Sequence, residues 1–312
     1  MASSKLGGTV NDIALLTLRS PYLTVGVDPA RGLSITSVVG VDGDEWLFFD
    51  PARGPRQVAA GTAYDDVWRG GFEELFPCDA PGRFDGRELP DHGELWREPF
   101  EVVQQDAMHI FGRRACDSVP ATVEKRIALM TDRPVARIAY RVTNTSDVVL
   151  RFLFKLHAAM RVEAGDELLL AGGTVTAVAP GFGPLADAAP LAWPARRTHT
   201  GEALDLSRVR ASDEGFREFV YVSDLPAGWC GVRRRRTGSK FRLRYPRDVF
   251  SHCWLFITYG GWRGYHTVVL EPCTNWPKDL AAAAQRGRCA SLGPGEWLNA
   301  TIELSVEPAH ER

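Results

Sequence analysis

Short runs of β-forming residues recur along almost the whole chain, and they restrict it to an all-β fold. The runs are rich in Val, Ile, Thr and aromatic residues, and clusters of Gly, Pro, Asp or Asn separate them. The clearest predicted strands cover residues 23–27, 33–39, 135–143, 148–156, 219–222, 241–245, 253–258 and 298–306. Because such runs with close turns are typical of antiparallel sheets, we predict a large antiparallel β-sandwich.

Helical periodicity is clear in only one segment, residues 278–285, which has an Ala-rich body and is followed by Gly287. Residues 177–194 are rich in Ala, Pro and Gly and are predicted to form a long surface excursion. Strand patterns continue on both sides of this stretch, which argues against a linker between domains. All-β sandwiches reach 312 residues as one unit, so a single domain over residues 1–312 is expected.

Charge and cysteine spacing exclude several classes of partner. The net charge is −2, so the chain carries no overall field that would attract nucleic acid or an acidic membrane surface. Residues 1–8 lack the pattern of a secretion signal, and no apolar run is long enough for a membrane helix. The six cysteines form no C-x-x-C pair, which argues against a zinc site and favours free thiols in a reducing cytoplasm. A small-molecule partner is expected, and one sequence leaves the oligomeric state open.

Polar residues in unusual places indicate where a ligand binds, because polar groups converge at the binding face of such a fold. Arg69 stands beside Gly70 and Gly71, and its planar set of donors suits adjacent hydroxyl groups. Paired glycines also allow close approach of the backbone or a ligand. An arginine that merely covers a turn would give the same pattern.

A second candidate segment, residues 89–97, combines a histidine with an aromatic ring and a cation. His92 precedes a glycine, Trp96 follows four positions later, and Arg97 comes next. A Trp face stacks on the C–H face of a sugar ring, and a histidine exchanges protons near neutral pH. A histidine with a purely structural role in a loop is the alternative.

Two further ionisable residues follow strongly apolar runs. His157 ends the run Phe152-Leu153-Phe154-Lys155-Leu156, and Glu271 follows Val268-Val269-Leu270. A carboxyl group in such a context is rarely buried without a partner, and partial burial raises its pKa toward that of a general base. A buried structural histidine would explain His157 equally well when it is taken alone.

Together, the four segments resemble the aldose 1-epimerase (galactose mutarotase-like) family. Members of that family carry an Arg near a Gly-rich turn, then His-Gly, a second His after a strand, and a Glu in a Leu-Glu-Pro context. The chain shows Arg69, His92-Gly93, His157 and Leu270-Glu271-Pro272 in that order. The resemblance covers roughly residues 30 to 306.

The resemblance implies a β-supersandwich and proton-transfer chemistry that needs no cofactor and no metal. The residue matching Glu271 would take the proton of the anomeric hydroxyl, while the residue matching His157 would protonate the ring oxygen. The residues matching His92 and Arg69 would hold the ring oxygen and the hydroxyls. One base and one acid acting together are what opening a hemiacetal requires.

The chain also departs from the family pattern. Pro90-Asp91 precedes the first histidine and Ala158-Ala159-Met160-Arg161 follows the second, which leaves the sugar undetermined. Asp205 and Asp224 are candidates for an acidic residue that grips hydroxyls. Three alternatives stay open: a sugar-phosphate mutarotase that uses Arg97 and the run of residues 233–236, another carbohydrate-active enzyme of the same fold, and a non-catalytic sugar-binding module.

Overall fold

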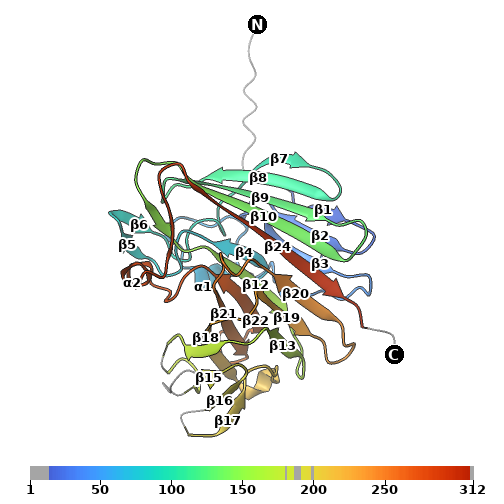
Figure 1. The fold of residues 1–312 in the computed structure, drawn as a ribbon. Coiled ribbons are helices and arrows are strands. Elements are labelled where there is room, and N and C mark those ends of the chain that lie inside the picture. Colours follow the sequence, from blue (N-terminus) through green and yellow to red (C-terminus); the bar gives the residue numbers. More distant parts are fainter. Residues whose placement is uncertain (1–13, 180, 186–190, 198–199, 310–312) are drawn as a thin grey trace.

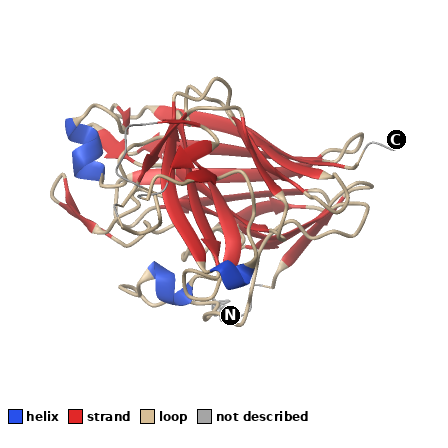
Figure 2. Ribbon diagram, turned by 90° about the horizontal axis from the view of Figure 1, so that it is seen from below, coloured by secondary structure: helices blue, strands red, loops and turns tan. Residues whose placement is uncertain are grey.

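Two large antiparallel sheets make up most of the molecule, and helices are short and few (Figures 1 and 2). The computed structural model describes residues 14–179, 181–185, 191–197 and 200–309. Residues 1–8, for which the sequence predicts no secretion signal, lie outside this described part. The all-β prediction is confirmed, and the architecture is a large antiparallel β-sandwich.

The first sheet has ten strands, in the order β1 (Leu16–Arg19), β2 (Thr24–Asp28), β3 (Ser34–Val39), β4 (Phe72–Leu75), β12 (Lys155–Arg161), β22 (His266–Cys273), β21 (His252–Tyr259), β18 (Phe216–Ser223), β14 (Thr174–Ala177) and β15 (Leu191–Ala192). The second sheet has eight strands, in the order β13 (Glu167–Leu170), β19 (Trp229–Arg233), β20 (Lys240–Arg244), β24 (Trp297–Glu307), β10 (Val135–Asn144), β9 (Ala121–Leu129), β8 (His109–Ala115) and β7 (Glu101–Gln105).

Three two-stranded sheets and three short helical segments complete the described part of the fold. The two-stranded sheets are β5 (Gly82–Phe84) with β6 (Arg87–Leu89), β11 (Leu150–Phe152) with β23 (Ala290–Leu292), and β16 (Ala195–Arg197) with β17 (Ala203–Asp205). The helices are α1 (Tyr64–Val67) and α2 (Leu280–Gln285), and η2 (Ser212–Glu214) is a 3₁₀ turn. The predicted helix at 278–285 is thus present but begins at Leu280, where the Asp279 carboxylate accepts a hydrogen bond from the backbone of Ala282 at 2.7 Å.

One predicted strand, residues 148–156, is wrong as a single element. The chain forms β11, which pairs with β23, and then begins β12 in the ten-stranded sheet. Between them the Leu153 amide donates to the carbonyl of Pro77 and the Phe154 amide to the Thr274 hydroxyl. Phe152, Leu153 and Phe154 are all buried across the break, so the apolar pattern carries no sign of the change of partner.

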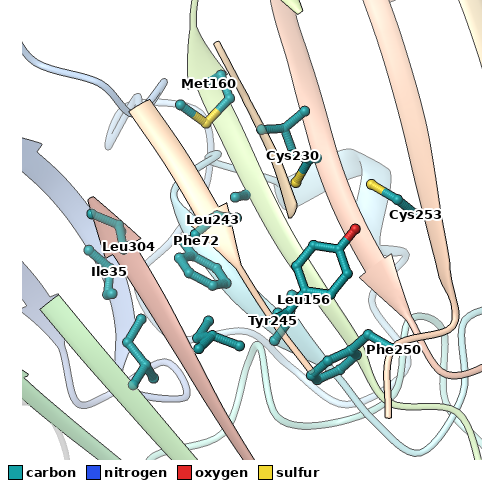
Figure 3. Close-up of a cluster of buried hydrophobic side chains, with 14 of the residues drawn as sticks. Ile35, Phe72, Leu156, Met160, Cys230, Leu243, Tyr245, Phe250, Cys253 and Leu304 are labelled. Carbon is teal, nitrogen blue, oxygen red and sulfur yellow. The ribbon is translucent and has the colours of Figure 1, made fainter. Parts of the chain in front are cut away.

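The core lies between the two large sheets and is formed by alternate residues of their strands. From the ten-stranded sheet, Phe72, Leu156 and Met160 point into it, and Leu243 and Leu304 face them from the eight-stranded sheet (Figure 3). The other face of the ten-stranded sheet carries a separate buried cluster. Alternation therefore leaves residues 155, 157 and 159 of β12 on the face away from the main core.

Residues 177–194 do not run only over the surface as predicted. Leu185 is buried, and its amide donates to the buried carboxylate of Glu218 at 2.9 Å. Phe182 packs against Phe256 with ring centroids 5.6 Å apart. Residues 180 and 186–190 of this stretch lie outside the described part of the chain. The described portion therefore folds back onto the ten-stranded sheet because it carries its own apolar anchors.

The cysteines agree with the expectation of free thiols. All six cysteines are free thiols, and four of them are buried. Within the described ranges, none of the helices is sufficiently long and apolar to span a membrane.

Candidate active site

A cavity of ≈ 340 Å³ opens on the face of the ten-stranded sheet that points away from the core. Its polar lining comes from both strands and loops: Tyr64, Asp65, Asp79, Asp91, His92, Lys155, His157, Glu271 and Lys278. The structure therefore brings together the three residues predicted to be catalytic, His92, His157 and Glu271. They come from a loop and two strands that are far apart in the sequence.

The strand register explains how His157 and Glu271 meet. β12 lies between β4 and β22 in the sheet. Lys155 pairs with Cys273 and Ala158 with Leu270, a register that places His157 opposite Glu271. The two side chains point to the same face, with His157 Nε2 3.9 Å from Glu271 Oε1. The imidazole and the carboxylate are thus held by neighbouring central strands, which are rigid supports for a site.

Lys155 forms a buried ion-pair triad with two carboxylates of the cavity. Its Nζ lies 2.6 Å from Asp79 Oδ1 and 2.6 Å from Glu271 Oε2. Burial alone would lower the pKa of Lys155, but the two carboxylates raise it, so the side chain remains charged. The ammonium group of Lys155 therefore supplies the positive charge between these two carboxylates. No group of three or more His, Cys, Asp or Glu side chains that could hold a metal ion is found in the described ranges.

The two central groups have pKa values displaced in opposite directions. Burial raises the pKa of Glu271, and Lys155 opposes that rise. Burial also lowers the pKa of His157 well below its ordinary value, with the charges of Lys155 and His92 acting in the same direction. Glu271 is therefore a stronger base than an ordinary carboxylate, and a protonated His157 is a stronger acid than an ordinary imidazolium.

The loop that carries His92 has a strained turn held by local hydrogen bonds. His92 has a positive φ of 57°, and Gly93 follows with φ 70°. A Cβ on Gly93 would lie 2.1 Å from the carbonyl oxygen of Phe76, so only glycine fits there. His92 Nδ1 lies 2.8 Å from Asp91 Oδ1, which orients the ring. The His-Gly pair of the sequence is explained by this close approach.

Aromatic rings form a wall of the cavity. Trp68, Phe182, Phe219, Phe256 and Trp262 line it. Rings of this kind stack on the C–H faces of sugars. Trp68 and Trp262 lie with ring centroids 6.3 Å apart, and Phe256 meets Trp262 edge-on at 5.1 Å.

For the aldose that the sequence predicts as substrate, substitution of Trp262 by Ala is expected to raise KM about 2–10-fold with little change in kcat. The reason is that an aromatic stacking contact contributes about 0.5–1.5 kcal/mol to binding. Initial rates over a range of sugar concentrations measure this. The matched control is Trp297→Ala, since Trp297 is exposed on β24 and does not line the cavity; an equal rise in that variant would contradict the assignment.

The three residues predicted to bind substrate do not line this cavity. Trp96 is 1% exposed, and its indole N–H donates to the carbonyl of Gly93 at 3.1 Å, so it supports the His92 loop. Arg69 is buried with its guanidinium 4.9 Å from the centre of the Phe49 ring. Arg97 faces Glu98, with Nε 3.4 Å from Oε1. Their substrate contacts remain predictions that this arrangement does not support.

Sequence reasoning missed Asp79, Lys155 and Tyr64, all of which line the cavity. One signal was present: Lys155 and His157 are two positions apart on a strand and so share a face. The candidates Asp205 and Asp224 lie elsewhere and do not line the cavity. Apart from Glu271 of β22, the acidic residues on the cavity wall, Asp65, Asp79 and Asp91, come from segments before β12.

The fold is similar to those of several solved structures. The sequence matches no protein-family model and no curated protein. Slr1438 from Synechocystis sp. PCC 6803 superposes with a TM-score of 0.72 at 17% identity, over 98% of this chain and 100% of that one. A galactose mutarotase-like protein from Lactobacillus casei gives a TM-score of 0.68 at 16% identity (94% and 100% covered).

A galactose mutarotase related enzyme from Lactobacillus acidophilus gives a TM-score of 0.65 at 16% identity, over 96% of this chain and 99% of that one. Each of these proteins is covered almost completely, so the similarity concerns the whole architecture. At 16–17% sequence identity, this similarity shows a shared fold and nothing more. The chain has the galactose mutarotase-like fold, as its sequence predicted.

Proposed function

We propose that this protein is an aldose 1-epimerase-like isomerase that interconverts the α and β anomers of an unphosphorylated aldose. The observation that carries the proposal is the pair Glu271 and His157, 3.9 Å apart on one cavity wall with pKa values displaced in opposite directions. The ordered motifs of the sequence and the mutarotase-like fold support the same reaction. Similarity of fold alone would not support a particular reaction, because one fold hosts many reactions.

The proposed reaction needs one proton taken and one given. The Glu271 carboxylate removes the proton of the anomeric hydroxyl while the His157 imidazolium protonates the ring oxygen, and the bond between C1 and the ring oxygen breaks. Rotation about the C1–C2 bond presents the other face of the aldehyde. On closure His157 takes back the proton from the ring-closing hydroxyl and Glu271 returns its proton to the new anomeric oxygen. The protein ends in its starting protonation state.

His92 lies beside this pair and is proposed to hold the oxygens of the sugar. It lines the cavity and is fixed by Asp91, and its ring stacks on Tyr64 with centroids 4.0 Å apart. A ring nitrogen in this position can donate a hydrogen bond to an oxygen on which charge develops. Asp79 and Asp91 offer acceptors to sugar hydroxyls at the same wall.

The charges around the cavity favour a neutral sugar over a sugar phosphate. Four carboxyl groups line it, Asp65, Asp79, Asp91 and Glu271, against two lysines, Lys155 and Lys278. Phosphate sites favour bidentate arginines, and none of the described arginines lines the cavity. In the run of residues 233–236, Arg234 pairs with Asp166 at 3.0 Å and Arg236 with Asp44 at 2.8 Å. These arginines therefore have structural partners away from the site.

The proposal is tested by proton NMR exchange between α and β anomers for a panel of free and phosphorylated aldoses. We expect faster interconversion for at least one free aldose and little effect on hexose 6-phosphates. Binding without acceleration of any sugar would instead support another reaction on this fold or a sugar-binding module. Acceleration only for phosphorylated sugars would overturn the argument from cavity charge.

A further inference from the structure

His157 lies between two carboxylates that come from the strands on either side of it. Glu73 of β4 is its direct partner in the register, and Glu271 of β22 lies on the opposite side. Glu271 lines the cavity, whereas Glu73 is buried behind it and is 3% exposed. A charged residue is rarely buried in this way without a partner. The proposed reaction uses Glu271 and leaves Glu73 without a role.

Tyr64 of helix α1 connects Glu73 to the imidazole. Its hydroxyl donates to Glu73 Oε2 at 2.7 Å and lies 3.2 Å from His157 Nδ1. The ring is held between His92, which stacks on it, and Trp96, which meets it edge-on at 4.8 Å. Burial, together with the Glu73 carboxylate, raises the pKa of Tyr64, so its hydroxyl keeps its proton. The hydroxyl is therefore a fixed, neutral link.

The single proton of this hydroxyl determines the tautomer of His157. Since Tyr64 uses its proton in the bond to Glu73, its oxygen can only accept from the imidazole. Nδ1 of His157 must then carry a proton, which leaves Nε2 to exchange a proton on the side of Glu271 and the cavity. In a neutral imidazole the hydrogen bond of one nitrogen selects the state of the other.

We propose that Tyr64 and Glu73 are positioning residues that hold His157 in its Nδ1–H tautomer and stabilise its protonated form. The inference rests on the proposed function only for its catalytic consequence, because the tautomer itself is a property of the resting protein. When Nε2 takes up a proton, the ring becomes an imidazolium whose Nδ1–H still donates to Tyr64. Burial raises the pKa of Glu73, while Arg31 and the hydrogen bond from Tyr64 oppose that rise. The Glu73 carboxylate then lies behind the new positive charge.

The balance of charge around His157 includes groups from every element that faces it. These groups are Tyr64 from α1, Glu73 from β4, Lys155 from its own strand, Glu271 from β22 and His92 from the loop before Gly93. Lys155 and His92 disfavour the imidazolium, as burial does. The carboxyl groups of Glu73 and Glu271 lie one on each side of the ring, where a negative charge favours the imidazolium. Removing Glu73 alone should therefore move the titration of His157 to lower pH.

The test is ¹⁵N NMR of imidazole nitrogens in the whole protein, with His157 identified by the signal lost in His157→Gln. In the wild type, at a pH above that at which His157 titrates, we expect the unprotonated nitrogen to be Nε2. Tyr64→Phe should shift the tautomer toward Nε2–H, since the acceptor for Nδ1–H is removed. Glu73→Gln should keep the Nδ1–H tautomer, because the amide oxygen can still accept from Tyr64, but should lower the pH at which His157 titrates.

Activity gives the second measurement. Tyr64→Phe is expected to lower kcat by about tenfold or more with KM little changed, because loss of the orienting partner of a catalytic histidine can cost far more than that. Glu73→Gln should move the alkaline limb of kcat, which the general acid His157 sets, to lower pH, and loss of packing alone would not do this. The matched control is Tyr259→Phe, which also removes a buried tyrosine hydroxyl but lies outside the cavity.

Two results would overturn the inference: an Nε2–H tautomer in the wild type, or an unchanged tautomer in Tyr64→Phe. Both are read without any sugar. If no aldose is turned over faster by the wild type, the proposed function fails while the tautomer measurement still decides the role of Tyr64 and Glu73. The two failures are therefore distinguishable.

Discussion

Glu271→Gln is expected to reduce anomer interconversion by at least about a hundredfold while leaving sugar binding nearly unchanged, since general acid–base catalysis contributes about 10²–10⁴-fold. The amide keeps the shape of the side chain but cannot accept the proton of the anomeric hydroxyl. Lys155 retains Asp79 as an ionic partner at 2.6 Å, so the wall of the cavity should persist. NMR exchange gives the rate, and quenching of the cavity tryptophans on titration with sugar gives the affinity.

The control for that variant is Glu218→Gln. Glu218 is a buried glutamate of the same sheet that accepts backbone hydrogen bonds and does not line the cavity. Its substitution should affect stability without removing turnover by folded protein. Activity retained in Glu271→Gln would mean that another group, such as Asp79 on the same wall, takes the proton.

The strands could be predicted from the sequence because their apolar pattern is local. Residues 135–143 and 253–258 fall within β10 and β21. The pairing between strands is not local, and the pattern around Phe152 therefore concealed the break between β11 and β12. Alternation along a strand is enough to place Lys155 and His157 on one face.

The site could be predicted only in part, for the same physical reason. His92, His157 and Glu271 stand out because each interrupts an apolar or glycine context. Asp79 and Tyr64 lie in segments without such contrast, and only the fold brings them to β12. Trp96 has the residue type expected for sugar stacking, yet its indole is used to hold the His92 loop. Residue type and spacing do not reveal which face of a loop a side chain occupies.

The buried triad also explains how the Glu271 carboxylate can be ionised although it is almost fully buried. Burial raises the pKa of Glu271, and Lys155 is the group that opposes the rise most. Burial also acts to raise the pKa of Asp79, but Lys155 holds that pKa below its ordinary value. The lysine therefore keeps both carboxyl groups available in charged form, at the expense of three buried charges.

Lys155→Met is accordingly expected to destabilise the protein by about 3–5 kcal/mol, the range for removing one partner of a buried ion pair. Asp79 and Glu271 would be left without their cation at a site where both are almost fully buried. Urea unfolding at pH 7 measures the loss. Folded protein should also lose activity near neutral pH, because Glu271 without Lys155 has a higher pKa and is protonated.

The loss of stability in Lys155→Met depends on pH with a definite sign. The pKa of Asp79 is lowered in the folded wild type, so its stabilisation is present above its unfolded pKa and is lost as pH falls through the folded value. The pKa of Lys155 is raised, so its contribution is complete below the unfolded value. The penalty in Lys155→Met should thus be largest near neutral pH and shrink toward about pH 4, because there the carboxyl groups of the unfolded chain also begin to bind protons.

Lys125→Met separates stability from function in this experiment. Lys125 is equally buried and pairs with Glu74 at 2.7 Å, but it lies in the core between the sheets and does not line the cavity. It should cost a comparable free energy of unfolding and leave turnover by the folded fraction intact. Adding Asp79→Asn to Lys155→Met should recover part of the lost stability, since it removes one of the two carboxyl groups that have lost their cation. Equal stability of Lys155→Met and wild type at pH 7 would contradict the triad, because two buried carboxylates cannot lose their cation without cost.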